Sequence, residues 1–229
     1  MWQVGDMGTA LIEVITLALA LAVNPLPVIA AILLVLSDHG RRNGLVFLGS
    51  WLGVLTVMSG VLVLLATASP VYDEGAESAL GALMRLGFGI ALLVLAGWKW
   101  RKAARDPDRS PPTWMTSLQT AKTRRAAALG AALAGGNPKN ILLTLAAAGA
   151  VAEFGLPIAA ELLVMFGFVL LASMAVAAPV VVSIALGERA APVLGRWQSF
   201  LDAHSVTLMV GILVIIGVLL TAQGLTTLI

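Results

Sequence analysis

The stretch Gly135-Gly136-Asn137-Pro138-Lys139-Asn140 lies at the centre of a long apolar run, which extends from Ala126 to Val151. Glycine forms helices poorly, and proline removes one backbone hydrogen bond and collides with the preceding turn. In hydrocarbon, the carbonyl groups freed by such a break need other partners, so breaks occur where protein or a water-filled cavity covers them. The stretch therefore predicts a membrane-crossing helix in two pieces, with its break inside the protein.

A second interruption of the same kind lies in the first part of the chain, at Asn24-Pro25-Leu26-Pro27. It also stands at the centre of an apolar run. Two broken segments at corresponding places in the two halves of a chain are the best sequence indication of a transporter's binding site. We therefore expect a site where the two breaks meet.

The composition is that of a polytopic membrane protein. The 229 residues are 59% hydrophobic and 11% charged, with a mean hydropathy of +0.98, whereas a soluble domain is about 25% charged. Cysteine is absent and there are two histidines, so we expect no disulfide, thiol nucleophile, metal site or cofactor. Residues 1–8 carry no Lys or Arg, so we expect the first apolar run to stay in the mature protein.

Six apolar runs are long enough to cross a bilayer, which takes about 20 residues. They are Thr9–Leu36, Gly44–Ala66, Ala79–Trp100, Ala126–Val151, Pro157–Leu186 and Ser205–Leu228. The predicted fold class is an all-α membrane protein with six transmembrane helices, of which the first and fourth are broken.

The basic residues indicate how these spans are oriented. Of the 14 Lys and Arg residues, 12 fall in alternate connections: Arg41, Arg42, Lys99, Arg101, Lys102, Arg105, Arg109, Lys122, Arg124, Arg125, Arg189 and Arg196. The connection between spans two and three is acidic instead. By the positive-inside rule, the basic connections are cytoplasmic and both termini lie outside.

Three spans in each half would make the second half enter the membrane from the opposite side. Residues 1–105 and 120–229 are then predicted to be inverted three-helix repeats, joined by a cytoplasmic linker at 106–119. The local likeness of residues 18–25 to residues 131–138 supports this reading. Chance similarity between two helices rich in alanine and leucine is the alternative.

Lys139 is the only side chain whose charge is predicted near the bilayer centre. A charge there costs about 2.5–3.5 kcal/mol, which makes it a functional candidate. One reading is that it bonds the carbonyls freed by Pro138, and another is that it binds a negative group of a substrate; both can hold at different steps of a cycle. Amides and proline-started helices also present donors to a ligand. The predicted substrate-binding residues are Asn24, Pro25, Pro27, Asn137, Pro138, Lys139 and Asn140.

Two absences narrow the function. No Asp or Glu is predicted near the membrane centre, which favours an anionic or zwitterionic substrate over a cation. No nucleotide-binding loop, serine-hydrolase motif or zinc-protease motif occurs, and no acid/base pair is predicted at depth, so we expect no enzyme and no catalytic residues. A gradient, a partner or downhill flow would supply the energy.

With these motifs, the chain resembles the LysE superfamily of bacterial exporters, and within it the GAP branch of mycobacterial glycolipid- and peptidoglycolipid-addressing proteins. The resemblance covers essentially the whole chain: six spans, a basic central loop, Asn-Pro-x-Pro in the first span and Asn-Pro-Lys-Asn in the fourth. Leu26 stands where amino-acid exporters typically have glycine, which puts an amino-acid substrate in doubt. The resemblance implies export of small solutes or, for the GAP branch, movement of cell-envelope lipids toward the outer surface of a bacterial plasma membrane.

The resemblance also assigns residues. Asn24, Pro25, Asn137, Pro138 and Lys139 match its motifs position by position. Two residues just past the first span are weaker candidates for a gate or an inner mouth, namely Asp38 and Arg41.

Three functions remain open: a transporter of an envelope glycolipid or lipid-linked precursor, a gradient-driven exporter of amino acids or other small solutes, and a non-transporting scaffold for envelope synthesis. A lateral opening lined by apolar side chains would favour lipid, and a closed polar cavity a solute. The scaffold hypothesis predicts that Lys139→Ala leaves function intact. It also predicts that neutralising the basic residues of the loop 101–125 abolishes function. The expected partners are membrane lipids and a glycolipid or small solute, not nucleic acid; a homodimer is left open.

Overall fold

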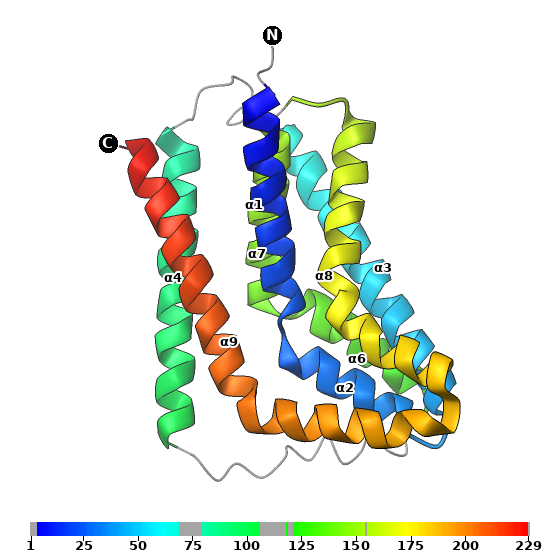
Figure 1. Cartoon of the computed structure of the whole chain (residues 1–229). Coiled ribbons are helices and arrows are strands. Elements are labelled where there is room, and N and C mark those ends of the chain that lie inside the picture. Colours follow the sequence, from blue (N-terminus) through cyan, green and yellow to red (C-terminus); the bar gives the residue numbers. More distant parts are fainter. Residues whose placement is uncertain (1–3, 69–78, 106–117, 119–120, 154, 229) are drawn as a thin grey trace.

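The computed structural model describes residues 4–68, 79–105, 118, 121–153 and 155–228, and every regular element within them is helical (Figure 1). The elements are α1 (Val4–Ala22), α2 (Pro25–Val35), α3 (Gly40–Thr67), α4 (Ala79–Arg105), α6 (Thr123–Gly135), α7 (Pro138–Ala152), α8 (Ile158–Leu186), the 3₁₀ helix η2 (Gly187–Arg189) and α9 (Ala190–Leu228).

Both predicted helix breaks are confirmed. α1 ends at Ala22 and α2 begins at Pro25, with a bend of 53° between the two helices. α6 ends at Gly135 and α7 begins at Pro138. Each second half begins with proline because the first helical position needs no N–H, and the fixed φ of proline suits a helix start.

The two broken helices run in opposite directions. In Figure 1 the chain descends through α1 to its break and continues into α2, whereas it rises from α6 through the second break into α7. This course is what inverted repeats would produce, but the repeat relationship itself stays a prediction. So does the division of the chain into two repeats and a linker, since most of residues 106–119 lie outside the described part.

Three described stretches have the length and hydropathy of a membrane span: Gly40–Thr67, Ile158–His204 and Val206–Thr226. The bent pair Leu11–Ala22 and Pro25–Val35 adds a fourth if it counts as one span. The chain is therefore a membrane protein with three to four candidate spans by this measure. Six spans remain a prediction, in which α4 and the α6–α7 pair would supply the other two.

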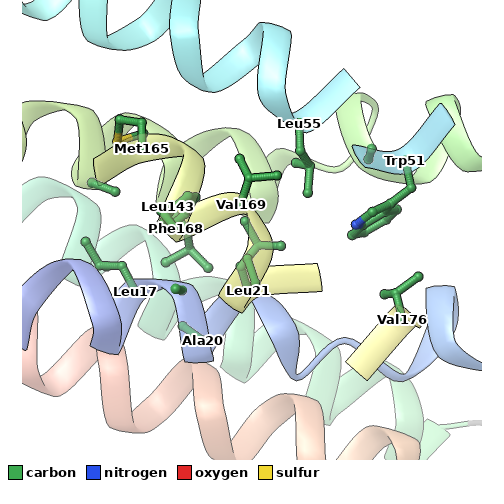
Figure 2. Close-up of a cluster of buried hydrophobic side chains, with 14 of the residues drawn as sticks. Leu17, Ala20, Leu21, Trp51, Leu55, Leu143, Met165, Phe168, Val169 and Val176 are labelled. Carbon is green, nitrogen blue, oxygen red and sulfur yellow. The ribbon is translucent and has the colours of Figure 1, made fainter. Parts of the chain in front are cut away.

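The core lies where α1, α3, α7 and α8 pack together (Figure 2). Its buried side chains include Leu17, Leu21, Trp51, Leu55, Leu143, Phe168 and Val169. The indole Nε1 of Trp51 donates a hydrogen bond of 3.1 Å to the hydroxyl of Ser173, so this large buried side chain leaves no polar atom unpaired. This bundle encloses the last turns of α1 and the start of α7, and so holds both breaks in place.

The prediction of a loop between spans five and six is wrong. The residues between spans five and six were expected to form a loop, but α9 begins at Ala190 and continues without interruption to Leu228. Its first part crosses one end of the molecule before the helix turns along α4 (Figure 1). The helix forms because Pro192 falls in the first turn, where proline is tolerated, and because Leu194, Trp197 and Leu201 recur at helical spacing.

The second part of α9 packs closely against α4 through glycine. A Cβ at Gly217 would lie 2.7 Å from Cγ of Leu93 and 3.0 Å from the carbonyl oxygen of Gly89. Small residues let two helix backbones approach in this way. Inside a bilayer the hydrophobic effect does not drive helices together, because lipid tails are equally apolar, so close packing contributes much of the association. Gly211, on the same helix, would meet nothing within 4 Å.

We therefore expect Gly217→Leu to lower the free energy of unfolding by about 1–3 kcal/mol, because the new side chain must push α4 away. Gly211→Leu is the matched control and should change it little. Thermal unfolding of the purified protein in detergent measures both. Equal effects of the two substitutions would contradict this packing of α4 on α9.

Candidate functional site

The end of α1 leaves carbonyl groups without helical partners, among them those of Ala20 and Val23. The N–H of Asn24 donates to Ala22 rather than to Ala20, and Pro27 has no N–H to offer to Val23. The ammonium of Lys139 fills both positions, donating to the Ala20 carbonyl at 2.9 Å and to the Val23 carbonyl at 3.2 Å. The first turn of α7 thus caps the end of α1 from the other half of the chain.

The end of α6 is capped from the same turn of α7. Pro138 cannot donate to the carbonyl of Ala134, and the Leu133 carbonyl likewise lies in the last turn before the break. Nδ2 of Asn140 donates to both of these carbonyls, at 3.0 Å each. Asn140 is completely buried, so its NH₂ is shielded from bulk solvent while it makes these two bonds.

One of the two readings of Lys139 is corrected by this arrangement. The carbonyl freed by Pro138 is bonded by Asn140, and Lys139 instead bonds carbonyls of the other break, because its longer side chain reaches across to α1. Lys139 is 1% exposed, and its ammonium faces the protein's own oxygens. The binding of a negative substrate group by Lys139 stays a prediction.

The two asparagines that precede the prolines have different roles. Oδ1 of Asn137 accepts the backbone N–H of Lys139 at 3.0 Å, which is an ordinary helix N-cap. Asn24 stands at the corresponding place before α2, but its side chain makes no capping bond. Within the described residues its Nδ2 has no partner, although Asn24 is 2% exposed. A buried polar group in this state costs about 1–3 kcal/mol, so it calls for an explanation.

A cavity of about 330 Å³ lies against the α1–α2 break and is partly open to the outside of the protein. Its walls come from the break, the middle of α8 and both parts of α9: Ala22, Val23, Asn24, Pro25, Val28, Ala175, Ala178, Trp197, Phe200, Leu201 and Leu208. Among the described residues that line it, Asn24 and Trp197 are the ones with hydrogen-bonding side chains. Of the predicted site residues, Asn24 and Pro25 line this cavity; Pro27, Asn137, Pro138, Lys139 and Asn140 do not.

A separate hollow of about 430 Å³ lies between the α2–α3 turn and the α8–α9 turn, and it involves only one of the two inner-mouth candidates. Arg41 lines it together with Ser37, Ser183 and Glu188, whereas Asp38 is exposed in the neighbouring turn and does not line it. The proposed gate therefore keeps Arg41 as a candidate, and nothing brings Asp38 to the same hollow.

Sequence reasoning missed two sets of residues. Glu161, in the first turn of α8, is fully buried, and its carboxylate accepts a hydrogen bond of 2.7 Å from the hydroxyl of Thr67. The signal was a single carboxylate in an apolar run. The sequence does not indicate Trp197 and Phe200 as pocket residues, because the basic residues near them predict a connection between two spans.

Comparison with known protein families identifies the chain over nearly its whole length. A family model named SfLAP and described as Sap, sulfolipid-1-addressing protein, matches residues 14–226. The chain belongs to the SfLAP family. In this SfLAP chain the matched part contains both breaks and the entire cavity wall. The match agrees with the resemblance to a GAP-like family, while membership of the LysE superfamily stays an expectation. Neither curated proteins nor solved structures gave a match.

Proposed function

We propose that this SfLAP chain moves an acylated lipid of the cell envelope across the membrane toward the outer surface. The observation that carries the proposal is the cavity at the α1–α2 break, which is partly open and lined almost entirely by apolar side chains. The family's description as a sulfolipid-1-addressing protein supports a lipid as the cargo. The carried lipid, its direction and its energy source belong to the proposal.

The walls of the cavity favour lipid over the alternative of a small polar solute. An amino acid in this cavity would exchange its hydrogen bonds to water for contacts with alanine, valine and leucine, which is costly. Two groups that such a solute would need, the ammonium of Lys139 and the NH₂ of Asn140, cap the ends of α1 and α6, and the amide of Asn24 alone does not replace them. An acyl chain meets no such penalty.

The proposed mechanism is rocking of one LysE-type inverted repeat against the other, in a six-span fold, about the two fixed breaks. The contact between Lys139 and the end of α1 joins the two halves of the chain at this point. In the proposed cycle, this contact holds the break closed in one state and loosens when the cavity opens. The ammonium is then free to meet a negative group of the lipid.

We further propose a bacterial plasma membrane as the location, with both ends of the chain outside. The starts of α3 and α6, the end of α4 and the first part of α9 lie at one end of the molecule (Figure 1), and they carry most of the Lys and Arg residues. Trp98 and Trp100 are exposed at the end of α4, and the ammonium of Lys102 lies 5.0 Å from the ring centre of Trp98. Aromatic and basic residues together are typical of the cytoplasmic interface.

Single cysteines test this orientation without background, because the chain has none. In intact cells, we expect Thr226→Cys to react with a membrane-impermeant maleimide, and Arg42→Cys to react only after the membrane is opened. Both positions are exposed and lie at opposite ends of the molecule. The reverse pattern of labelling would overturn the orientation.

Filling the cavity tests the function. We expect Ala178→Trp to reduce the envelope lipid exposed on the surface of the source organism to the level of a deletion strain, because the indole occupies the space of the chain. Leu163→Trp is the matched control on α8, since Leu163 is 70% exposed and does not line the cavity. Surface lipids are extracted and quantified by mass spectrometry, with protein levels checked by immunoblot. Unchanged surface lipid in Ala178→Trp would refute the proposal.

A further inference from the structure

We propose that the side-chain amide of Asn24 binds the carbonyl of an acyl ester or amide, so that the cavity holds the first part of one acyl chain rather than the lipid's headgroup. The inference rests on the proposed function and adds to it the part of the lipid that is recognised. It also assigns Asn24 as the residue that determines specificity.

Asn24 is the buried polar residue of the cavity wall, and its NH₂ lacks a partner within the described residues. Its side chain is 2% exposed, its Nδ2 is without a hydrogen bond in the described part of the chain, and it makes no cap to α2. Of the next three positions only Leu26 has an N–H, and the Asn24 side chain does not accept it as a cap. A rotation of the amide about its terminal torsion, which is broad in energy, brings either the oxygen or the NH₂ to the cavity.

The absence of charged residues from the cavity wall favours a ligand group that is an uncharged hydrogen-bond acceptor. None of the described residues that line the cavity is charged, and the ammonium of Lys139, which bonds the residue before Asn24, is occupied by the carbonyls of Ala20 and Val23. A sulfate or phosphate placed here would lose its hydration with no cation to replace it. A carbonyl oxygen needs a single donor, and the NH₂ of Asn24 supplies one.

The size of the cavity fits one chain. Its volume of about 330 Å³ is at the lower end of the range of about 300–1,000 Å³ for small-molecule sites, so several acyl chains do not fit together. From Asn24 the walls continue over Phe200, Leu201 and Leu208, all apolar, which suits the methylenes that follow a carbonyl. The headgroup then lies outside the cavity.

Lys139 acts here as a positioning residue. It bonds the carbonyl of Val23, which directly precedes Asn24, and that of Ala20 in the last turn of α1. These two bonds fix the backbone from which the Asn24 amide projects. Lys139 thereby influences lipid recognition without contacting the lipid in this state.

A pair of single-chain lipids that differ only in the carbonyl tests the inference. The purified protein in detergent is titrated with 1-palmitoylglycerol and with 1-O-hexadecylglycerol, each brominated on the chain, and quenching of Trp197 fluorescence is followed. Trp197 lines the cavity, and a Trp197→Phe variant identifies its share of the signal. We expect the ester to bind roughly two- to tenfold more tightly than the ether, the range that one hydrogen bond provides.

The variant Asn24→Ala should bind both lipids equally, with the affinity of the wild-type protein for the ether. Equal binding of ester and ether by the wild-type protein would overturn the role of Asn24 while leaving lipid transport in place. If neither lipid quenched Trp197, the cavity would not be a lipid site and the proposed function would fail as well. The wild-type comparison decides the point even if Asn24→Ala does not fold.

Discussion

Asn140→Asp is expected to destabilise the protein by about 3 kcal/mol or more, although the two side chains have nearly the same size. The substitution removes the NH₂ that donates to the carbonyls of Leu133 and Ala134, and it places a carboxylate oxygen against two carbonyl oxygens in a fully buried site. If the aspartic acid takes up a proton, its one O–H still replaces two N–H donors. For a chain of this length, the loss corresponds to an unfolding temperature lower by roughly 6–12 °C.

Asn137→Asp is the matched control for that experiment. Asn137 uses its Oδ1 as an acceptor for the N–H of Lys139, and a carboxylate accepts this bond equally well at the positive end of α7. The control should therefore change the unfolding temperature little. Unfolding in detergent is followed by intrinsic fluorescence on heating. A similar loss of stability in both variants would mean that Asn140 does not cap α6.

Lys139→Met is expected to abolish lipid delivery to the surface while leaving the protein folded. The substitution leaves two buried carbonyls unpaired, at about 1–3 kcal/mol each, but it also removes a buried ammonium that costs about 2.5–3.5 kcal/mol. These contributions nearly cancel, so the unfolding temperature should move little. The local effect is large, because the end of α1 loses both hydrogen bonds that it accepts from Lys139 of α7.

Two measurements distinguish this result from simple unfolding. Hydrogen exchange should become faster at residues 20–26 while the middle of α8 stays protected, and surface lipid should fall to the level of the deletion strain. Lys122→Met makes the same chemical change at an exposed position before α6 and should alter neither. Wild-type surface lipid in Lys139→Met would favour the scaffold over the transporter.

The breaks were predictable from sequence because their causes are local. Proline without an N–H and paired glycines interrupt a helix wherever they stand in an apolar run, so the boundaries at Asn24 and Asn137 followed from the residues alone. Such reasoning cannot say which donor reaches which carbonyl. That Lys139 crosses to α1 while Asn140 serves its own break depends on how α1 and α7 pack.

The cavity was not predictable for the same reason. Asn24 and Pro25 were candidates from their motif, but the opposite wall is made by Ala178 on α8 and by Trp197 and Phe200 on α9. The aromatic pair looked like part of a basic inner loop, and only the course of α9 across the end of the molecule brings it to the break (Figure 1). The complete burial of Glu161 likewise depends on contact with α3.

Photo-crosslinking with a diazirine-bearing acyl lipid tests most directly whether an acyl chain occupies the break. The reconstituted protein is irradiated, and the labelled residues are mapped by mass spectrometry. We expect labels to concentrate at Val28, Leu201 and Leu208 and to disappear from them in Ala178→Trp. Val57 is 67% exposed on α3 and reports ordinary bilayer contact. Labelling of Val57 as strong as that of the cavity, and unchanged by Ala178→Trp, would contradict the account.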